Sequence, residues 1–238
     1  MYRRNHPSGQ RGNVMENPQF EFTAFIENLN SRTRGMISGA HLTFPTTTEL
    51  VQATLNIIGV DGLRNEEIIV TDYTISIPGL RSVLGEYASI DELNYLAHRI
   101  QGMTPEEQAK FVSALKHGEY ADGLQDVINL TYNLDCYELI PEVTTYEEYG
   151  RYLAESQRDF QLPAQAAMYF DYASYGEDSA INEGGELTPQ GYIYNNRSPF
   201  RDVYDGKNVP EEYRVFKYPM QVRAKQQKTT KPPKPPQR

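Results

Sequence analysis

The stretch FEFTAFIENL at residues 20–29 decides the fold class of this 238-residue chain. Apolar and polar residues alternate along it, which is the pattern of a β-strand with one buried face. A second strand is predicted at 36–44, a helix that Gly59 ends follows it, and a third strand is predicted at 66–77. These elements make a ββαβ unit, so we predict a small α+β domain over residues 19–81.

The following segment has the pattern of a helical domain. Ser89 and Thr104 each precede a glutamate by three positions, which is the capping box that opens a helix. A third helix is predicted at about 121–131 from its apolar residues on one face. We therefore predict a helical middle domain over residues 82–131.

The α+β pattern returns in the next part of the chain. A strand predicted at 135–141 is followed by a capping box at Thr145, which opens another helix. Residues 162–180 are predicted to be helical in two pieces, and a strand-like stretch follows them. We predict a second α+β domain over residues 132–196.

Both ends of the chain are polar and carry basic residues. Residues 1–18 are predicted to be a disordered extension. Residues 197–238 are predicted to be a basic tail that ends in the proline-rich sequence KTTKPPKPPQR, which is expected to be extended and unpacked.

Acidic residues are concentrated in the predicted folded part. The chain has 32 acidic and 23 basic residues, a net charge of −9. All 32 acidic residues but only 13 basic ones lie between residues 16 and 214, which gives that interval a net charge of −19. Such a body repels nucleic-acid phosphates over a Debye length of about 8 to 10 Å, so we expect no direct DNA binding by it. A basic partner protein fits this charge.

The sequence lacks the patterns that build metal, nucleotide or nucleophilic sites. The four histidines have no metal-ligand spacing, Cys136 is the single cysteine, and no glycine-rich phosphate loop occurs. We therefore expect no metal, no cofactor and no enzymatic activity, although an acid/base hydrolase that uses two of the many carboxylates stays open as an alternative. One cysteine, no apolar run of membrane-spanning length and no signal peptide favour a cytoplasmic protein.

Four segments of the chain are typical of one protein family. They are FEFTAFIENL; IIVTDYTISIPGL followed by GEYASIDELNYLAHRI; CYELIPEVTTYEEYGRYLAE; and LPAQAAMYFDYASYGEDSAINEGG. The most specific parts are E-E-Y-G-R-Y-L-A-E and D-Y-x-x-Y-G-x-D with its trailing glycine pair. On these motifs, residues from about 20 to 196 resemble the ArdA antirestriction proteins of conjugative plasmids and transposons.

The resemblance implies an elongated, curved chain of three domains, which forms a homodimer and imitates the charge of bent B-form DNA. It implies an inhibitor that catalyses nothing and occupies the DNA-binding groove of type I restriction-modification enzymes, so that their specificity and methyltransferase subunits cannot engage the duplex. Whether modification is blocked along with restriction stays open. The family's antirestriction segment would fall on residues 145–159, close to the dimer contact. The candidates for that contact are Tyr146, Tyr149, Tyr152 and Leu153.

The charge agrees in scale with DNA mimicry. A dimer would carry twice the net charge of −19 of the interval 16–214, which matches about 65 Å of duplex at one charge per roughly 1.7 Å. Carboxylates three or four positions apart on a helix lie about 5 to 6 Å apart, comparable to neighbouring phosphates. The candidate phosphate substitutes are Asp91, Glu92, Glu106, Glu107, Glu138, Glu142, Glu147, Glu148, Glu155, Asp171, Glu177 and Asp178. An acidic scaffold for another basic, DNA-binding protein remains the alternative to mimicry.

The last family segment contains YFDYASYGED at residues 169–178, with four aromatic rings and three carboxylates. Tyr169, Phe170, Tyr172 and Tyr175 have helical spacing, so they are predicted to be the aromatic packing of the third domain. The carboxylates between them are then expected at the surface.

Overall fold

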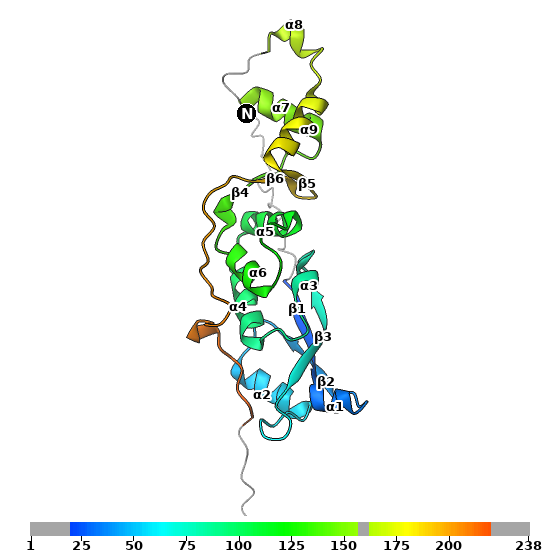
Figure 1. Cartoon of the computed structure of the whole chain (residues 1–238), viewed down its shortest axis with the longest axis vertical. Coiled ribbons are helices and arrows are strands. Elements are labelled where there is room, and N and C mark those ends of the chain that lie inside the picture. Colours follow the sequence, from blue (N-terminus) through cyan, green and yellow to red (C-terminus); the bar gives the residue numbers. More distant parts are fainter. Residues whose placement is uncertain (1–19, 157–161, 220–238) are drawn as a thin grey trace, which may run out of the picture.

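Two small antiparallel sheets lie at different levels of an elongated α+β molecule (Figure 1). The computed structural model describes residues 20–156 and 162–219. In this part of the chain the first sheet lies toward one end, a group of helices lies in the middle, and the second sheet lies beyond them with its own helices. The mixed α+β composition is confirmed, whereas the division into three domains stays a prediction.

The first sheet consists of β1 (Phe22–Asn28), β2 (Gly39–Thr43) and β3 (Ile68–Ile75) in the order β2-β1-β3, with both pairings antiparallel. The alternation in the central strand has its predicted effect, because Phe22, Ala24 and Ile26 are fully buried. A short helix, α1 (Leu29–Thr33), follows β1, and α2 (Thr48–Ile57) contacts β2. The strands and the main helix of the predicted ββαβ unit are confirmed.

Four helices connect the two sheets: α3 (Leu80–Val83), α4 (Ile90–Gln101), α5 (Pro105–His117) and α6 (Leu124–Leu130). The capping box at Thr104 is confirmed, because its hydroxyl accepts from the N–H of Glu107 and the Glu107 carboxylate accepts from the N–H of Thr104. The capping box predicted at Ser89 is wrong, since the Ser89 side chain makes no capping hydrogen bond and Glu92 binds elsewhere.

The second sheet consists of β4 (Tyr137–Ile140), β5 (Glu186–Thr188) and β6 (Gly191–Asn195) in the antiparallel order β4-β6-β5, and a 3-10 helix (Leu134–Cys136) leads into it. α5 supports this sheet, because Lys110 Nζ donates to the Tyr137 carbonyl at 2.7 Å and Lys116 Nζ donates to the Leu187 carbonyl at 3.0 Å. Beyond the sheet lie α7 (Tyr146–Ser156), α8 (Ala164–Ala167) and α9 (Tyr172–Glu183), which include the predicted helix after Thr145 and the predicted two helical pieces (Figure 1).

The buried core forms one large cluster and one small one. The large cluster runs from Phe22 in β1 through Leu96 in α4 and Phe111 in α5 to Ile193 in β6. The small cluster joins Ile140, Val143, Tyr149, Ala180 and Tyr192 between the second sheet and the helices beyond it. The predicted boundary at residues 81 and 82 therefore does not coincide with a gap in the core.

The chain beyond β6 folds back along the molecule. Residues 197–219, which we call the strap, pass the middle helices and reach α2 (Figure 1). Its side chains Tyr204, Val209 and Val215 are buried in the large cluster. The prediction of an unpacked tail from residue 197 is therefore wrong for the strap, because burial of these irregularly spaced side chains holds it on the body. The rest of that tail and the extension at 1–18 lie outside the described residues.

Candidate functional site

Negative charge is concentrated at one end of the molecule. The described residues between 135 and 196, which we call the acidic end, hold 11 acidic side chains and a single basic one, Arg151. Arg151 is already engaged, because its Nη2 lies 2.8 Å from Glu147 Oε1 and its guanidinium lies over the Tyr172 ring at 4.4 Å from the centroid. From outside this end, Lys116 pairs with Glu186 at 2.7 Å. The other described carboxylates of the acidic end keep a large excess of negative charge.

A contact between two glycines joins α7 to α9. Gly150 and Gly176 are buried, and a Cβ built at Gly176 would lie only 2.7 Å from the Gly150 nitrogen. The same Cβ would overlap the Tyr146 carbonyl, and a Cβ at Gly150 would overlap the Tyr172 carbonyl. Only glycine permits so close an approach of two helix backbones. Gly150 belongs to E-E-Y-G-R-Y-L-A-E and Gly176 to D-Y-x-x-Y-G-x-D, so the two most specific motifs meet at this contact.

A carboxylate and two tyrosines anchor these helices on the second sheet. The rings of Tyr149 and Tyr192 stack with centroids 3.9 Å apart, and both hydroxyls donate to Glu183 Oε1. Burial raises the pKa of both phenols well above the ordinary value, and the hydrogen bond to Glu183 adds to the rise. His117 of α5 bonds through Nε2 to the Gly184 carbonyl at 2.8 Å, which fixes the end of α9 as well.

Two of the predicted acids cap the helices of the acidic end. Glu148 Oε2 accepts from the Thr144 N–H at 2.8 Å and from the Thr145 N–H at 3.1 Å, and Asp171 Oδ1 accepts from the Ser174 N–H at 3.0 Å. The backbone N–H of Thr144 is the largest cause that lowers the pKa of Glu148, and that of Ser174 is the largest for Asp171. These exposed carboxylates therefore stay charged while they stabilise the first turns of α7 and α9.

The remaining predicted acids fall into three groups. Three have a local partner: Glu107 in its capping box, Glu147 with Arg151, and Glu138, which accepts from Asn196 Nδ2 at 3.3 Å. Five are exposed and have neither a hydrogen bond nor an ion pair with another described residue, namely Glu106, Glu142, Glu155, Glu177 and Asp178. We call these five the free acids. The last two, Asp91 and Glu92, bind the strap.

Asp91 and Glu92 are half-buried beneath the strap. Asp91 Oδ1 accepts from the backbone N–H groups of Val215 and Phe216, both at 2.7 Å, and Glu92 Oε1 accepts from the Tyr204 hydroxyl at 2.8 Å. Their prediction as phosphate substitutes is therefore corrected, because these oxygens hold the chain's own backbone and side chain rather than facing outward.

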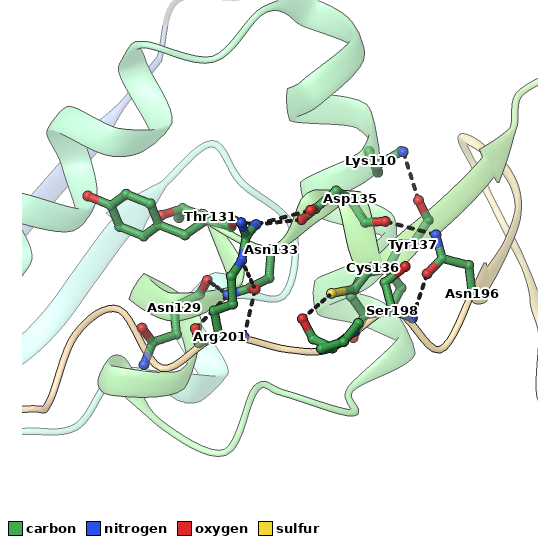
Figure 2. A network of polar contacts seen from close by, with 12 residues as sticks. Lys110, Asn129, Thr131, Asn133, Asp135, Cys136, Tyr137, Asn196, Ser198 and Arg201 are labelled. Carbon is green, nitrogen blue, oxygen red and sulfur yellow. Dashed lines mark hydrogen bonds and ion pairs between the residues drawn. The ribbon is translucent and has the colours of Figure 1, made fainter.

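Two asparagines four positions apart, Asn129 on α6 and Asn133 just after it, hold the first half of the strap. Asn133 Nδ2 donates to the Arg201 carbonyl and its Oδ1 accepts from the Arg201 N–H, both at 2.9 Å (Figure 2). Arg201 also pairs with both carboxylate oxygens of Asp135 at 3.0 Å (Figure 2). Asn129 makes the corresponding pair of bonds to Tyr204. Sequence reasoning missed this arrangement, for which the one signal was a pair of asparagines four positions apart, one in the predicted helix and one just after it.

Two of the aromatic residues, Tyr149 and Tyr169, differ from their predicted positions. Tyr149 is 2% exposed, so its prediction as a dimer contact is wrong: the side chain is used in the small core. Tyr146 and Leu153 are partly buried against that core, whereas Tyr152 is 43% exposed. Tyr169 is 85% exposed in the turn that follows α8, so its predicted packing within the third domain is also wrong.

The described residues contain no group of three or more histidine, cysteine, aspartate or glutamate side chains that could hold a metal ion. Among them, no helix is both long and apolar enough to cross a membrane.

Comparison with protein families gives a match to a known family. The sequence model of the family described as antirestriction protein (ArdA) matches residues 24–194, from β1 to β6. No curated protein matches the chain significantly. The family match covers more than two thirds of the chain, including both glycine-containing motifs and excluding the strap. The chain therefore belongs to the ArdA family of antirestriction proteins, which are non-enzymatic inhibitors of type I restriction-modification systems.

Proposed function

We propose that this protein inhibits type I restriction-modification enzymes by imitating DNA. It would occupy the groove in which their specificity and methyltransferase subunits hold the duplex. The observation that carries the proposal is the acidic end, which holds 11 described carboxylates and one arginine; ion pairs with that arginine, with Lys116 and with Arg201 engage only three of the 11. A groove built to bind phosphates presents basic side chains, and such a surface supplies the matching negative charge without a duplex.

The free acids are the phosphate substitutes that we propose first. Glu155 lies on α7, and Glu177 and Asp178 lie on α9, so two helices in contact carry three of the five. Glu107, Glu138, Glu147, Glu148 and Asp171 would contribute to the same field, although each also has a local partner. Binding would then depend on many carboxylates, each with a small share.

We also propose a homodimer of three-domain chains, with domains over 19–81, 82–131 and 132–196. The elongated arrangement supports it, because two such molecules could cover a DNA-binding groove longer than one of them. Tyr152 is the candidate for the dimer contact that retains an exposed apolar surface. The proposed target is a DNA-binding enzyme, which would place the protein in the cytoplasm.

A titration of a type I restriction endonuclease tests the mimicry. The enzyme, at a known concentration of active complexes, cleaves its substrate DNA while the protein is added in increasing amounts. We expect inhibition to be complete near a fixed stoichiometric ratio, to weaken when the salt concentration rises from about 50 to 200 mM, and to be relieved by excess duplex.

Three results would overturn the proposal. Inhibition at far less than stoichiometric amounts would indicate catalysis. Inhibition that resists salt would remove the electrostatic basis. Binding that excess duplex cannot displace would indicate an acidic scaffold on another surface of the enzyme. A parallel assay of methylation shows whether modification is blocked as well.

A further inference from the structure

The contact between Gly150 and Gly176 fixes how far apart α7 and α9 lie. Helices that pack through ordinary side chains have axes about 8 to 10 Å apart. Here each glycine faces the backbone of the other helix, so that even one methyl group at either position has no room. Arg151 of α7, seated over the Tyr172 ring of α9, adds a second contact on the same pair.

α7 and α9 also carry several of the proposed phosphate substitutes, so the separation of the two helices affects the positions of these carboxylates. α7 holds Glu148 and Glu155, which are seven positions apart and therefore lie on one face of the helix. α9 holds Glu177 and Asp178 next to Gly176 itself. The distance between the acids of one helix and those of the other therefore follows from the glycine contact.

We propose that Gly150 and Gly176 are positioning residues for inhibition, because their contact sets the spacing of the carboxylates that the target reads as phosphates. The proposal rests on the DNA mimicry proposed above. Long-range attraction changes little when charges shift by 1 to 2 Å, but charge-assisted hydrogen bonds to arginine have lengths of about 2.7 to 2.9 Å and a fixed direction. A groove shaped for phosphates of fixed spacing would lose such bonds if the helices moved apart.

The first experiment compares Gly150→Ala and Gly176→Ala with the control Gly85→Ala. An added Cβ at Gly85 has no atom within 4 Å, so the control introduces the same methyl group without a clash. Each variant is tested at a temperature at which circular dichroism shows it folded, for inhibition of the endonuclease and for binding to polylysine. Polylysine is flexible and reads total charge but not spacing.

We expect Gly150→Ala and Gly176→Ala each to need at least about tenfold more protein than the wild type for half-inhibition. Both should bind polylysine as the wild type does. The control Gly85→Ala should equal the wild type in both assays. If the folded variants inhibit like the wild type, the proposal fails. If they lose polylysine binding to the same extent as inhibition, spacing is not the cause and the proposal fails too.

A second experiment leaves the glycines in place, in case their variants do not fold. Glu155 and Ser156 are both exposed at the end of α7, and the exchange Glu155→Ser with Ser156→Glu keeps the total charge but moves one carboxylate by about 100° around the helix. If spacing matters, the exchange loses as much inhibition as Glu155→Ser alone, about two- to threefold. Full inhibition by the exchange variant would overturn the proposal. Failure of wild-type protein to inhibit stoichiometrically would instead overturn the mimicry.

Discussion

Asn129 on α6 pairs with the backbone of Tyr204 in the strap as another strand would: its Nδ2 donates to the Tyr204 carbonyl at 2.9 Å, and its Oδ1 accepts from the Tyr204 N–H at 2.8 Å. Asn129 is 1% exposed, and Tyr204 is 3% exposed. This amide therefore satisfies the buried Tyr204 N–H, which burial would otherwise leave without a partner, and gives the Tyr204 carbonyl a shorter bond than the one of 3.5 Å from Gln125 Nε2.

The first prediction concerns this pairing. Asn129→Ala leaves the Tyr204 N–H buried and unpaired and leaves the Tyr204 carbonyl only the bond of 3.5 Å from Gln125 Nε2, so we expect a loss of about 2 to 3 kcal/mol in the free energy of unfolding. Urea denaturation measures it. The control is Asn56→Ala, at an exposed position of α2, which we expect to stay within about 0.5 kcal/mol of the wild type. Equal stability of the two variants would show that the strap does not depend on Asn129.

The second prediction concerns the other half of the strap. Asp91 accepts from two successive backbone N–H groups, those of Val215 and Phe216, and Asp91→Ala removes both bonds. We expect faster amide hydrogen exchange at these two residues, because they open without unfolding the whole chain. Asp91→Asn is the matched variant, since its carbonyl oxygen can still accept, and it should exchange at an intermediate rate. Wild-type protection in Asp91→Ala would contradict the contact.

The strands of the first sheet and the helix α5 could be predicted from the sequence because they obey simple periodicities, whereas the hairpin β5–β6 was predicted only as one strand-like stretch. β1 alternates apolar and polar residues, and α5 opens with a proline and a complete capping box. The strap has neither period: Tyr204, Val209 and Val215 are buried at irregular intervals. Its backbone bonds go to side chains of α2, α4 and α6 and to Asn133, and pairing of this kind leaves no repeating pattern in a sequence.

The candidate site was predicted by residue type but not by environment. Composition identified an acidic surface, and Glu155, Glu177 and Asp178 are exposed on it. Composition could not distinguish these residues from Asp91, whose carboxylate is bound by the strap, because that depends on a segment more than 120 positions away. The two glycines of the family motifs could not be paired either, since only the fold brings α7 against α9.

The third prediction uses the lowered pKa of Glu148. Its carboxylate accepts from the Thr144 N–H in the folded protein, so its folded pKa lies below its value of about 4.3 in an unfolded chain. A lowered folded pKa contributes stability that is present above the unfolded pKa and is lost as the pH falls through the folded pKa. We therefore expect Glu148→Gln to lower the melting temperature at pH 7.

Below the folded pKa of Glu148, the wild type and Glu148→Gln should melt alike, because both side chains are then neutral. The control is Glu142→Gln, at an exposed position without a hydrogen bond to any described residue, whose difference from wild type should not follow this titration. A melting-temperature difference for Glu148→Gln that is the same at pH 3 and pH 7 would contradict the prediction.

The last prediction distinguishes a spread surface charge from a catalytic pair. Each free acid is exposed, and a single exposed charge contributes about 1 kcal/mol or less to an interaction in water. We therefore expect each single neutralisation, Glu106→Gln, Glu142→Gln, Glu155→Gln, Glu177→Gln or Asp178→Asn, to raise the protein concentration for half-inhibition by less than about fivefold. An acid/base hydrolase would instead lose its activity with one of them.

A variant that combines the five changes removes five proposed contacts with the endonuclease, each of which makes the binding affinity depend on salt concentration. If all five acids replace phosphates, the slope of the logarithm of affinity against the logarithm of salt concentration should become shallower by up to about 4 to 5. Binding to the endonuclease at several salt concentrations measures this slope. Asp91→Asn removes one charge from a carboxylate that binds the strap, so it should leave the slope at the wild-type value. A change in slope for Asp91→Asn but not for the combined variant would place the target surface at the strap rather than at the free acids.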